Sequence, residues 1–357
     1  MPRLVAIALL TTCMSVLAQQ GNAVERVSFR DDKDIQRDVV GEVLVEAQNG
    51  GMMLRADDGS IWLVQPEQLI ERKTEYGEFA PLDDDTMEQR LLQEFDGFDV
   101  YRTQHYVLVY NSSEAYAKQV GALFEQLYRG FFTFWKNQRW DLPKPEFPLV
   151  AVVLRDRAAF LHHARADIGE TAESVIGYYH LSSNRMTTFN VPNWERNVAT
   201  IIHEATHQLA YNCGLQKRFA DNPMWVSEGL ATFFETPDLR NPGRWRTIGR
   251  VNPVNLMRWR RYLPNRPAES LATLLANDDR YRNPATAPDA YAEGWALTYF
   301  LIKTKRREYV GYLKLLSEGK PLAEKTKKER IDVFEEAMGC TLVELDKSFV
   351  SYMSRIR

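Results

Sequence analysis

The sequence has no excess of charge of either sign. Its 45 Lys and Arg residues and 48 Asp and Glu residues leave a formal net charge of −3 over 357 residues. Electrostatic binding to nucleic acid or to an anionic membrane surface calls for a basic balance or a basic patch. The composition therefore argues against both as partners, and the length leaves room for one large domain and one small one.

A hydrophobic run long enough to span a membrane comfortably is also missing. Residues 4–17 are apolar, but the run is short, follows a single arginine, and leads to Val-Leu-Ala at 16–18, which suits a signal peptidase. We therefore expect residues 1–18 to be a signal peptide and the mature protein to begin near Gln19, exported to a bacterial periplasm or secreted. The alternatives are an uncleaved anchor and a lipid on Cys13, although threonine precedes that cysteine where lipoproteins carry a small residue.

Cysteine is scarce. The sequence has three, and removal of the signal peptide would leave Cys213 and Cys340. An exported protein can pair two cysteines, and such a bridge would tie the end of the helix that carries residue 207 to the C-terminal segment. Two buried free thiols are the alternative, because the sequence does not establish how closely the two Cα atoms approach.

Short strands dominate the N-terminal part of the chain. Residues 19–38 are polar, have no clear period, and are predicted to be a linker. Residues 39–47, 52–55 and 61–64 have strand-like patterns and are joined by Asn-Gly and Asp-Gly turns. We expect residues 19–75 to form this linker and a small β-rich module. The module carries no catalytic constellation and would serve either in docking or as a structural cap.

Residues 76–357 are predicted to form a second, larger domain, entered through an acidic hinge at residues 81–85. Strand and helix patterns come first, and the segment after residue 190 is mainly helical. The expected strands are 106–110, 148–154, 177–179 and 185–190, and the expected helices among them are 114–135 and 158–165. The whole chain is therefore predicted to have an α+β fold.

The stretch His203-Glu204-Ala205-Thr206-His207 carries the clearest chemistry. Side chains at i and i+4 lie on one face of a helix, so His203 and His207 can bind one metal ion together. Glu204 points about 100° away around the helix and can address a metal-bound water. This spacing is typical of zinc hydrolases, in which the carboxylate is the general base. The alternative is a helix whose histidines only satisfy buried hydrogen bonds.

A third ligand is expected on the next helix. Asn222-Pro223 is a typical helix start, and Glu228 is the only acidic residue among apolar neighbours before Glu235. A carboxylate on such a helix is costly to bury unless it is paired or binds a metal ion. Two histidines, one glutamate and a water form a catalytic Zn²⁺ set with an open position. A partly exposed Glu228 is the alternative.

The segments HEATHQ and PMWVSEGLATFFE, about twenty residues apart, resemble the gluzincin branch of the HExxH zinc metallopeptidases. Within that branch the chain resembles bacterial peptidase-MA-like families of largely unknown substrate. The resemblance runs from about Tyr101 to the C-terminus and is strongest at residues 197–235. It implies a zincin-like catalytic domain with a sheet before the HExxH helix and a mainly helical C-terminal half. Thr232 stands where thermolysin-like members have an aspartate, so the support of the zinc histidines must differ here.

The resemblance implies two further features of the active site. In this family a strand that borders the cleft can pair with an extended peptide, and residues 186–190 are the candidate for that strand, with ordinary sheet interior as the alternative. Tyr291 matches the family tyrosine that donates its hydroxyl to the developing oxyanion. A tyrosine on a helix also often serves packing alone.

The sequence thus predicts an exported Zn²⁺-dependent metallohydrolase, more specifically a peptidase that acts on peptides or proteins. His203, His207 and Glu228 would hold the metal, Glu204 would take a proton from bound water, and Tyr291 would stabilise the oxyanion. The alternative is a non-catalytic cell-envelope scaffold or binding protein that keeps the metallopeptidase fold. Glu204 favours the enzyme, because a purely structural site has no use for a base.

Overall fold

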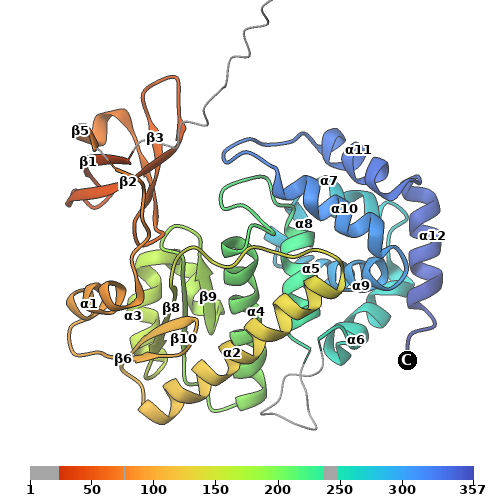
Figure 1. Ribbon diagram of the computed structural model, residues 1–357. Coiled ribbons are helices and arrows are strands. Elements are labelled where there is room, and N and C mark those ends of the chain that lie inside the picture. Colours follow the sequence, from red (N-terminus) through yellow and green to blue (C-terminus); the bar gives the residue numbers. More distant parts are fainter. Residues whose placement is uncertain (1–23, 76, 237–247) are drawn as a thin grey trace, which may run out of the picture.

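The computed structural model describes residues 24–75, 77–236 and 248–357. The predicted signal peptide, residues 1–18, lies outside the described residues. Two β-sheets occupy the N-terminal half, and the C-terminal half is mainly helical (Figure 1). The predicted α+β fold is therefore confirmed.

The first sheet is antiparallel and has the strand order β4-β3-β2-β1-β5. Its strands are β1 (Val24–Arg30), β2 (Gln36–Glu46), β3 (Met52–Ala56), β4 (Ile61–Val64) and β5 (Leu69–Glu75), with a short 3-10 helix, η1 (Pro66–Gln68), before β5. Val27 and Phe29 of β1 belong to its small core. The predicted linker is therefore wrong for β1, because charged residues beside these two alternating positions obscured the strand pattern.

An α-helix, α1 (Asp84–Glu94), replaces the predicted acidic hinge. The Asp83 side chain accepts a hydrogen bond from Thr86 N–H, and the acidic residues of the first turn lie at the positive end of the helix dipole. Met87 and Leu91, four residues apart, are buried against the second sheet. The end of the acidic run is therefore a helix start, and the hinge prediction was wrong for residues 84 and 85.

The second sheet has the strand order β6-β7-β8-β10-β9. Its strands are β6 (Asp99–Arg102), β7 (Tyr106–Tyr110), β8 (Leu149–Leu154), β9 (Gly177–His180) and β10 (Arg185–Phe189). Strands β7, β8 and β10 are parallel, and β6 and β9 pair antiparallel at the two edges. Helices α1 and α3 (Arg157–Ile168), followed by η2 (Gly169–Ser174), cover one face, and α2 (Glu114–Asn137) and α4 (Trp194–Asn212) cover the other.

The strand at the edge beside α4 is β9, and not the predicted segment 186–190. β10 contains most of that segment and pairs with β8 on one side and with β9 on the other. The hairpin places β9 outside β10, although β9 comes earlier in the chain. The prediction was wrong because strand order depends on long-range pairing, which a local hydrophobic pattern does not encode.

The remaining helices form the C-terminal half of the molecule, and α5 packs between α4 and α9. They are α5 (Met224–Phe234), α6 (Pro253–Tyr262), η3 (Leu263–Asn265), α7 (Ser270–Ala276), α8 (Asp279–Arg282), α9 (Ala287–Thr304), α10 (Arg306–Ser317), α11 (Lys327–Met338) and α12 (Leu342–Met353). No helix in the described part of the chain is long and apolar enough to cross a membrane. Cys213 and Cys340 are free, so the alternative with a disulfide does not hold.

The first sheet meets the second domain through the hairpin of β3 and β4. Ile61 N–H donates a 2.7 Å hydrogen bond to Ser182 O in the turn between β9 and β10. A Cβ at Gly59 would lie 2.8 Å from the Phe147 ring, so this contact requires glycine. The module therefore touches the hairpin that carries the edge strand of the second sheet.

Candidate metal centre

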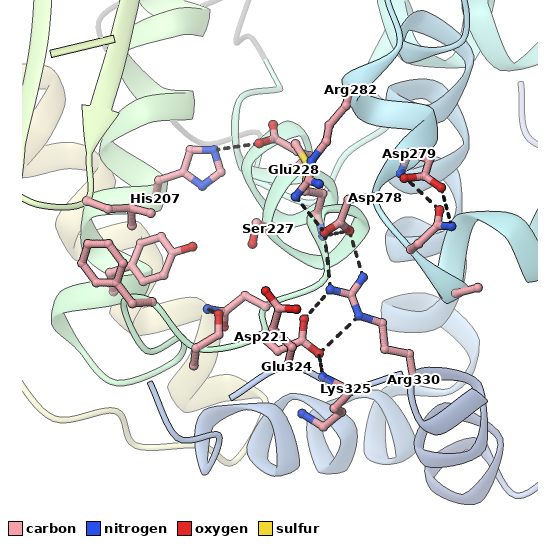
Figure 2. A pocket seen from close by; sticks show the side chains of 18 of the residues that line it. His207, Asp221, Ser227, Glu228, Asp278, Asp279, Arg282, Glu324, Lys325 and Arg330 are labelled. Carbon is pink, nitrogen blue, oxygen red and sulfur yellow. Dashed lines mark hydrogen bonds and ion pairs between the residues drawn. The ribbon is translucent and has the colours of Figure 1, made fainter. Parts of the chain in front are cut away.

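Three side chains from two helices converge on one point. The ligand atoms of His203, His207 and Glu228 all lie within 4.8 Å of one another. His203 Nε2 is 3.1 Å from Glu228 Oε2, and His207 Nε2 is 3.7 Å from Glu228 Oε1. Figure 2 shows His207 directed toward Glu228. The structure thus brings together the three residues that the sequence selected as ligands.

The geometry of this group suits a tetrahedral metal ion. Zinc binds histidine nitrogen and carboxylate oxygen at about 2.0–2.2 Å, which places neighbouring donor atoms about 3.4 Å apart in a tetrahedron. The two separations of 3.1 and 3.7 Å bracket that value. The structure therefore shows a group that can hold a metal ion, and its nitrogen and oxygen donors are of the types that zinc accepts.

Helix α4 holds its two histidines against the second sheet. Asn193 caps the start of the helix by accepting a hydrogen bond from Arg196 N–H. The buried Gln208 donates to Val150 O in β8 and to Asn184 O in the turn between β9 and β10. Because Gln208 directly follows His207, these two bonds fix the helix to the sheet at the metal group.

Helix α5 positions Glu228 by close packing on α9. A Cβ at Gly229 would lie 2.9 Å from Gly294 O, so glycine is needed for this approach of the two helices. Asp278 Oδ1 accepts a 3.0 Å hydrogen bond from Met224 N–H and so caps a helix that begins after a proline. Both contacts fix the helix that carries Glu228.

Glu235, at the C-terminal end of α5, supports His203. Its Oε2 is 2.9 Å from His203 Nδ1, and because an ionised carboxylate only accepts hydrogen bonds, this nitrogen carries a proton. Asn252 Nδ2 donates to the other oxygen of Glu235 at 3.2 Å. These two hydrogen bonds fix the orientation of the His203 imidazole, whose Nε2 then points at Glu228.

Thr232 does not take the place of the aspartate found in thermolysin-like proteins. Its hydroxyl donates within its own helix, to Glu228 O at 2.7 Å and to Gly229 O at 3.1 Å. The motif did not reveal the role of Glu235, which lies seven residues after Glu228 and hence on the same helix face two turns later. That spacing was the available signal. Asn252 precedes α6, which is far from the motif in sequence, so no local pattern predicts its contact with Glu235.

Without a metal ion the group is a partly buried ion pair. Burial alone would lower the pKa of His203, but its hydrogen bonds with Glu228 and Glu235 outweigh burial and raise it. Burial alone would raise the pKa of Glu228, but the charge of His207 and the hydrogen bond with His203 lower it. A metal ion must therefore displace a proton from His203 when it binds.

Glu204 lies beside the metal group without belonging to it. Its Oε2 accepts a 2.9 Å hydrogen bond from Tyr179 N–H in the edge strand β9. Burial raises the pKa of Glu204, and the positive charges of His203 and His207 oppose that rise. The residue lines the same cavity as the metal group, so it can exchange a proton with a molecule bound there.

Tyr291, near the start of α9, lines this cavity as well. Burial, followed by the negative charges of Glu228 and Glu204, raises the pKa of its phenol, so the hydroxyl stays protonated and can donate a hydrogen bond. Tyr281 packs edge-on against its ring at a centroid distance of 5.0 Å. The structure thus places Tyr291 around one cavity with Glu204 and the metal group.

The cavity has a volume of about 820 Å³ and is lined by two walls, together with residues 276–282 and Tyr291. The metal wall consists of β9, α4 and α5. The loop wall consists of residues 213–223, between α4 and α5, and residues 318–326, between α10 and α11; these two loops lie side by side in Figure 1. Arg330 binds Asp221 and lies 3.0 Å from Asp278 Oδ1, as Figure 2 shows, and so ties the loop wall to the cap of α5.

Two bulky apolar residues of the loop wall have a left-handed backbone. The φ angle is 60° at Phe219 and 62° at Leu322, and Leu322 N–H donates a 2.7 Å hydrogen bond to Phe219 O. Such a conformation costs a residue other than glycine about 1–2 kcal/mol. Leu322 is 53% exposed, so burial of its side chain offsets little of that cost.

Comparison with protein families places the metal group inside a matched region. Residues 197–323 match the family model described as "Protein of unknown function (DUF1570)". The match covers about a third of the chain and includes all the site residues from His203 to Tyr291. No curated protein matches the sequence. The family description assigns no activity, so the function has to be argued from the geometry of the site.

Proposed function

We propose that the protein is a zinc-dependent metallohydrolase, and specifically a peptidase. The observation that carries this proposal is the position of Glu204. It is a partly buried carboxylate that faces the cavity next to the three-residue metal group, and its hydrogen-bonding partner is a backbone amide rather than a cation. A purely structural metal site has no use for such a group, whereas hydrolysis requires a base there.

Three residues would hold the metal, one would transfer a proton, and one would donate a hydrogen bond to the substrate. His203, His207 and Glu228 supply the ligand atoms. A bound zinc ion would polarise a substrate carbonyl and lower the pKa of water from 15.7 to about 7. Glu204 would accept the proton of the attacking water on a carboxylate oxygen and deliver it to the leaving amine. The Tyr291 hydroxyl would donate a hydrogen bond to the carbonyl oxygen as negative charge develops on it.

The edge strand supports a peptide as substrate. β9 is the edge strand of the second sheet, and its residue Tyr179 lines the cavity. An edge strand offers unpaired backbone groups to an extended chain, which is a common mode of peptide recognition. This role, predicted for residues 186–190, passes to β9 because β10 is paired on both sides.

We further propose that the protein is exported and acts in the periplasm or outside the cell, with residues 1–18 removed as a signal peptide. The support is the sequence pattern of that segment alone. Mass spectrometry of the protein recovered from the producing cells would show a chain that starts near Gln19. An intact Met1, or a lipid on Cys13, would contradict export by this route.

The peptidase proposal is tested with a mixture of unstructured peptides of varied sequence. The zinc-loaded protein is incubated with the mixture, and new termini are identified by mass spectrometry. We expect cleavage that stops when a chelator removes the metal and returns when zinc is restored. A zinc-loaded protein that cleaves no peptide would contradict the proposal.

A further inference from the structure

The loop wall carries an apolar feature that the proposed chemistry does not use. Phe219 and Leu322 come from loops a hundred residues apart, line the metal cavity together, and are joined by one backbone hydrogen bond. Both have left-handed backbones, which are genuine outliers for bulky residues. Such strained positions are maintained where the surrounding structure holds them, and they cluster at ligand-binding sites.

The folded structure gains little from the Leu322 side chain. More than half of the side chain is exposed, and the surrounding segment 318–326 is held by other contacts. These contacts are the backbone bond to Phe219 O, a bond from Lys325 N–H to Asp221, and the ion pair between Arg330 and Asp221. Glycine or asparagine would make the same backbone bond without the strain. The leucine side chain therefore needs a reason outside the fold.

The charge of Asp221 does not supply that reason. Asp221 of the loop wall and Asp278, which precedes α8, both bind Arg330 of α11, so the charges of the two aspartates are compensated. Glu324 and Lys325 also line the cavity, but Phe219 and Leu322 are the bulky apolar side chains that the loop wall presents to it, and Leu322 is 53% exposed. Transfer of a bulky apolar side chain from water to such a surface lowers the free energy of binding, whereas glycine has no side chain to contribute.

We propose that Phe219 and Leu322 form a specificity-determining apolar subsite, which receives a bulky aliphatic or aromatic side chain of the peptide substrate beside the metal group. The inference rests on the proposed function, because the occupant is part of a substrate bound at that metal. It goes further in naming the class of residue that the enzyme selects.

The test uses amino-acid hydroxamates, which bind zinc through the hydroxamate group and present one side chain. The dissociation constants of leucine hydroxamate and glycine hydroxamate are measured by calorimetry on the zinc-loaded full chain. We expect leucine hydroxamate to bind at least about 10-fold more tightly, because burial of a leucine side chain is worth roughly one to two such factors. In Leu322→Gly this ratio should fall toward 1, and in Leu322→Met it should be retained.

The melting temperature separates recognition from a structural role. Leu322→Gly relieves the left-handed strain and should melt no lower than the wild type, whereas a leucine kept for stability would melt lower when removed. Ile35→Gly is the matched control, since Ile35 is 47% exposed in a loop of the first sheet and should leave the hydroxamate ratio unchanged.

The outcomes distinguish this inference from the proposed function. Failure of the wild type to bind either hydroxamate would overturn the zinc site and the subsite together. Tight but equal binding of leucine and glycine hydroxamates would overturn the subsite alone. An undiminished leucine preference in Leu322→Gly would also overturn it, because the preference would then arise elsewhere in the cavity.

Discussion

The two walls of the cavity differ in how they are built. The metal wall is made of regular helices and a strand, and each ligand helix is capped and tied to a neighbour through Gln208, Gly229 and Asp278. The loop wall is made of two irregular segments with bulky left-handed residues and an exposed leucine. Metal ligands and catalytic groups need a geometry held to within a fraction of an ångström, which rigid elements provide, whereas loops suit variable recognition.

This contrast predicts that changes to the metal wall affect chemistry or metal binding, whereas changes to the loop wall affect selectivity or stability. The largest effect is expected for Glu204→Gln. Glutamine keeps the shape of the side chain but cannot accept the proton, so the rate of peptide hydrolysis should fall about 10²–10⁴-fold. The zinc content should stay unchanged, because Glu204 is not a ligand. A variant that keeps the wild-type rate would show that another group is the base.

Loss of the support for His203 should have the next largest effect. Without Glu235 the His203 ring loses its orientation, so Glu235→Ala should weaken zinc binding about 10–100-fold in a chelator competition. Glu235→Gln keeps a hydrogen-bond acceptor and should weaken zinc binding less. Thr232→Ala is the matched control on the same helix, since its hydroxyl bonds only backbone. Equal zinc affinities in Glu235→Ala and Thr232→Ala would show that Glu235 does not support His203.

The pH dependence of stability provides a subtler check of the metal wall. The pKa of His203 is raised above its ordinary value of 6.5, so the stability that its protonated form provides is complete below about pH 6.5 and lost as the pH rises through the raised pKa. The chelator-treated protein should therefore lose this contribution to its melting temperature above pH 6.5. Zinc binding, which displaces the proton, should strengthen over the same range. Identical pH profiles with and without zinc would argue against a protonated His203 in the metal-free state.

The smallest effect on metal binding is expected for Arg330, which ties the loop wall to the cap of α5. Arg330→Gln leaves the partly buried Asp221 without its cation and leaves Asp278 with only Arg282, 3.8 Å away. Breaking a buried ion pair costs about 3–5 kcal/mol of stability. The melting temperature should fall clearly, while zinc affinity should fall less than in Glu235→Ala. Asp221→Asn, which removes one acid and keeps the other paired, should be milder. A zinc affinity that falls further in Arg330→Gln than in Glu235→Ala would erase the distinction between the walls.

The metal wall was far more predictable from the sequence than the loop wall. Helical spacing and the cost of burying a lone carboxylate led to His203, His207 and Glu228 because each argument needs only local sequence. Glu235 was within reach of the same reasoning through its spacing from Glu228. Asn252 was not, because it approaches from another helix. The edge position of β9 likewise depends on pairing with β10, and no local pattern encodes it.

The loop wall left no comparable signal. Phe219 and Leu322 are residue types that disfavour the left-handed region, so the sequence predicts an ordinary backbone for both. Their pairing joins segments a hundred residues apart. The helix start at residues 83–85 was also missed. An acidic run is compatible with a hinge or with a helix N-terminus, and the buried Met87 and Leu91, four residues apart, are what identify the helix.

The central claim is that His203, His207 and Glu228 bind one zinc ion, and its most direct test is the metal content of purified protein. Wild type, Glu228→Ala and the control Glu324→Ala, an exposed glutamate on the loop wall, are loaded with zinc, dialysed together and analysed by elemental mass spectrometry. We expect about one zinc per chain in the wild type and the control and a near-complete loss in Glu228→Ala. Zinc retained by Glu228→Ala at the wild-type level, or no zinc in the wild type, would contradict it.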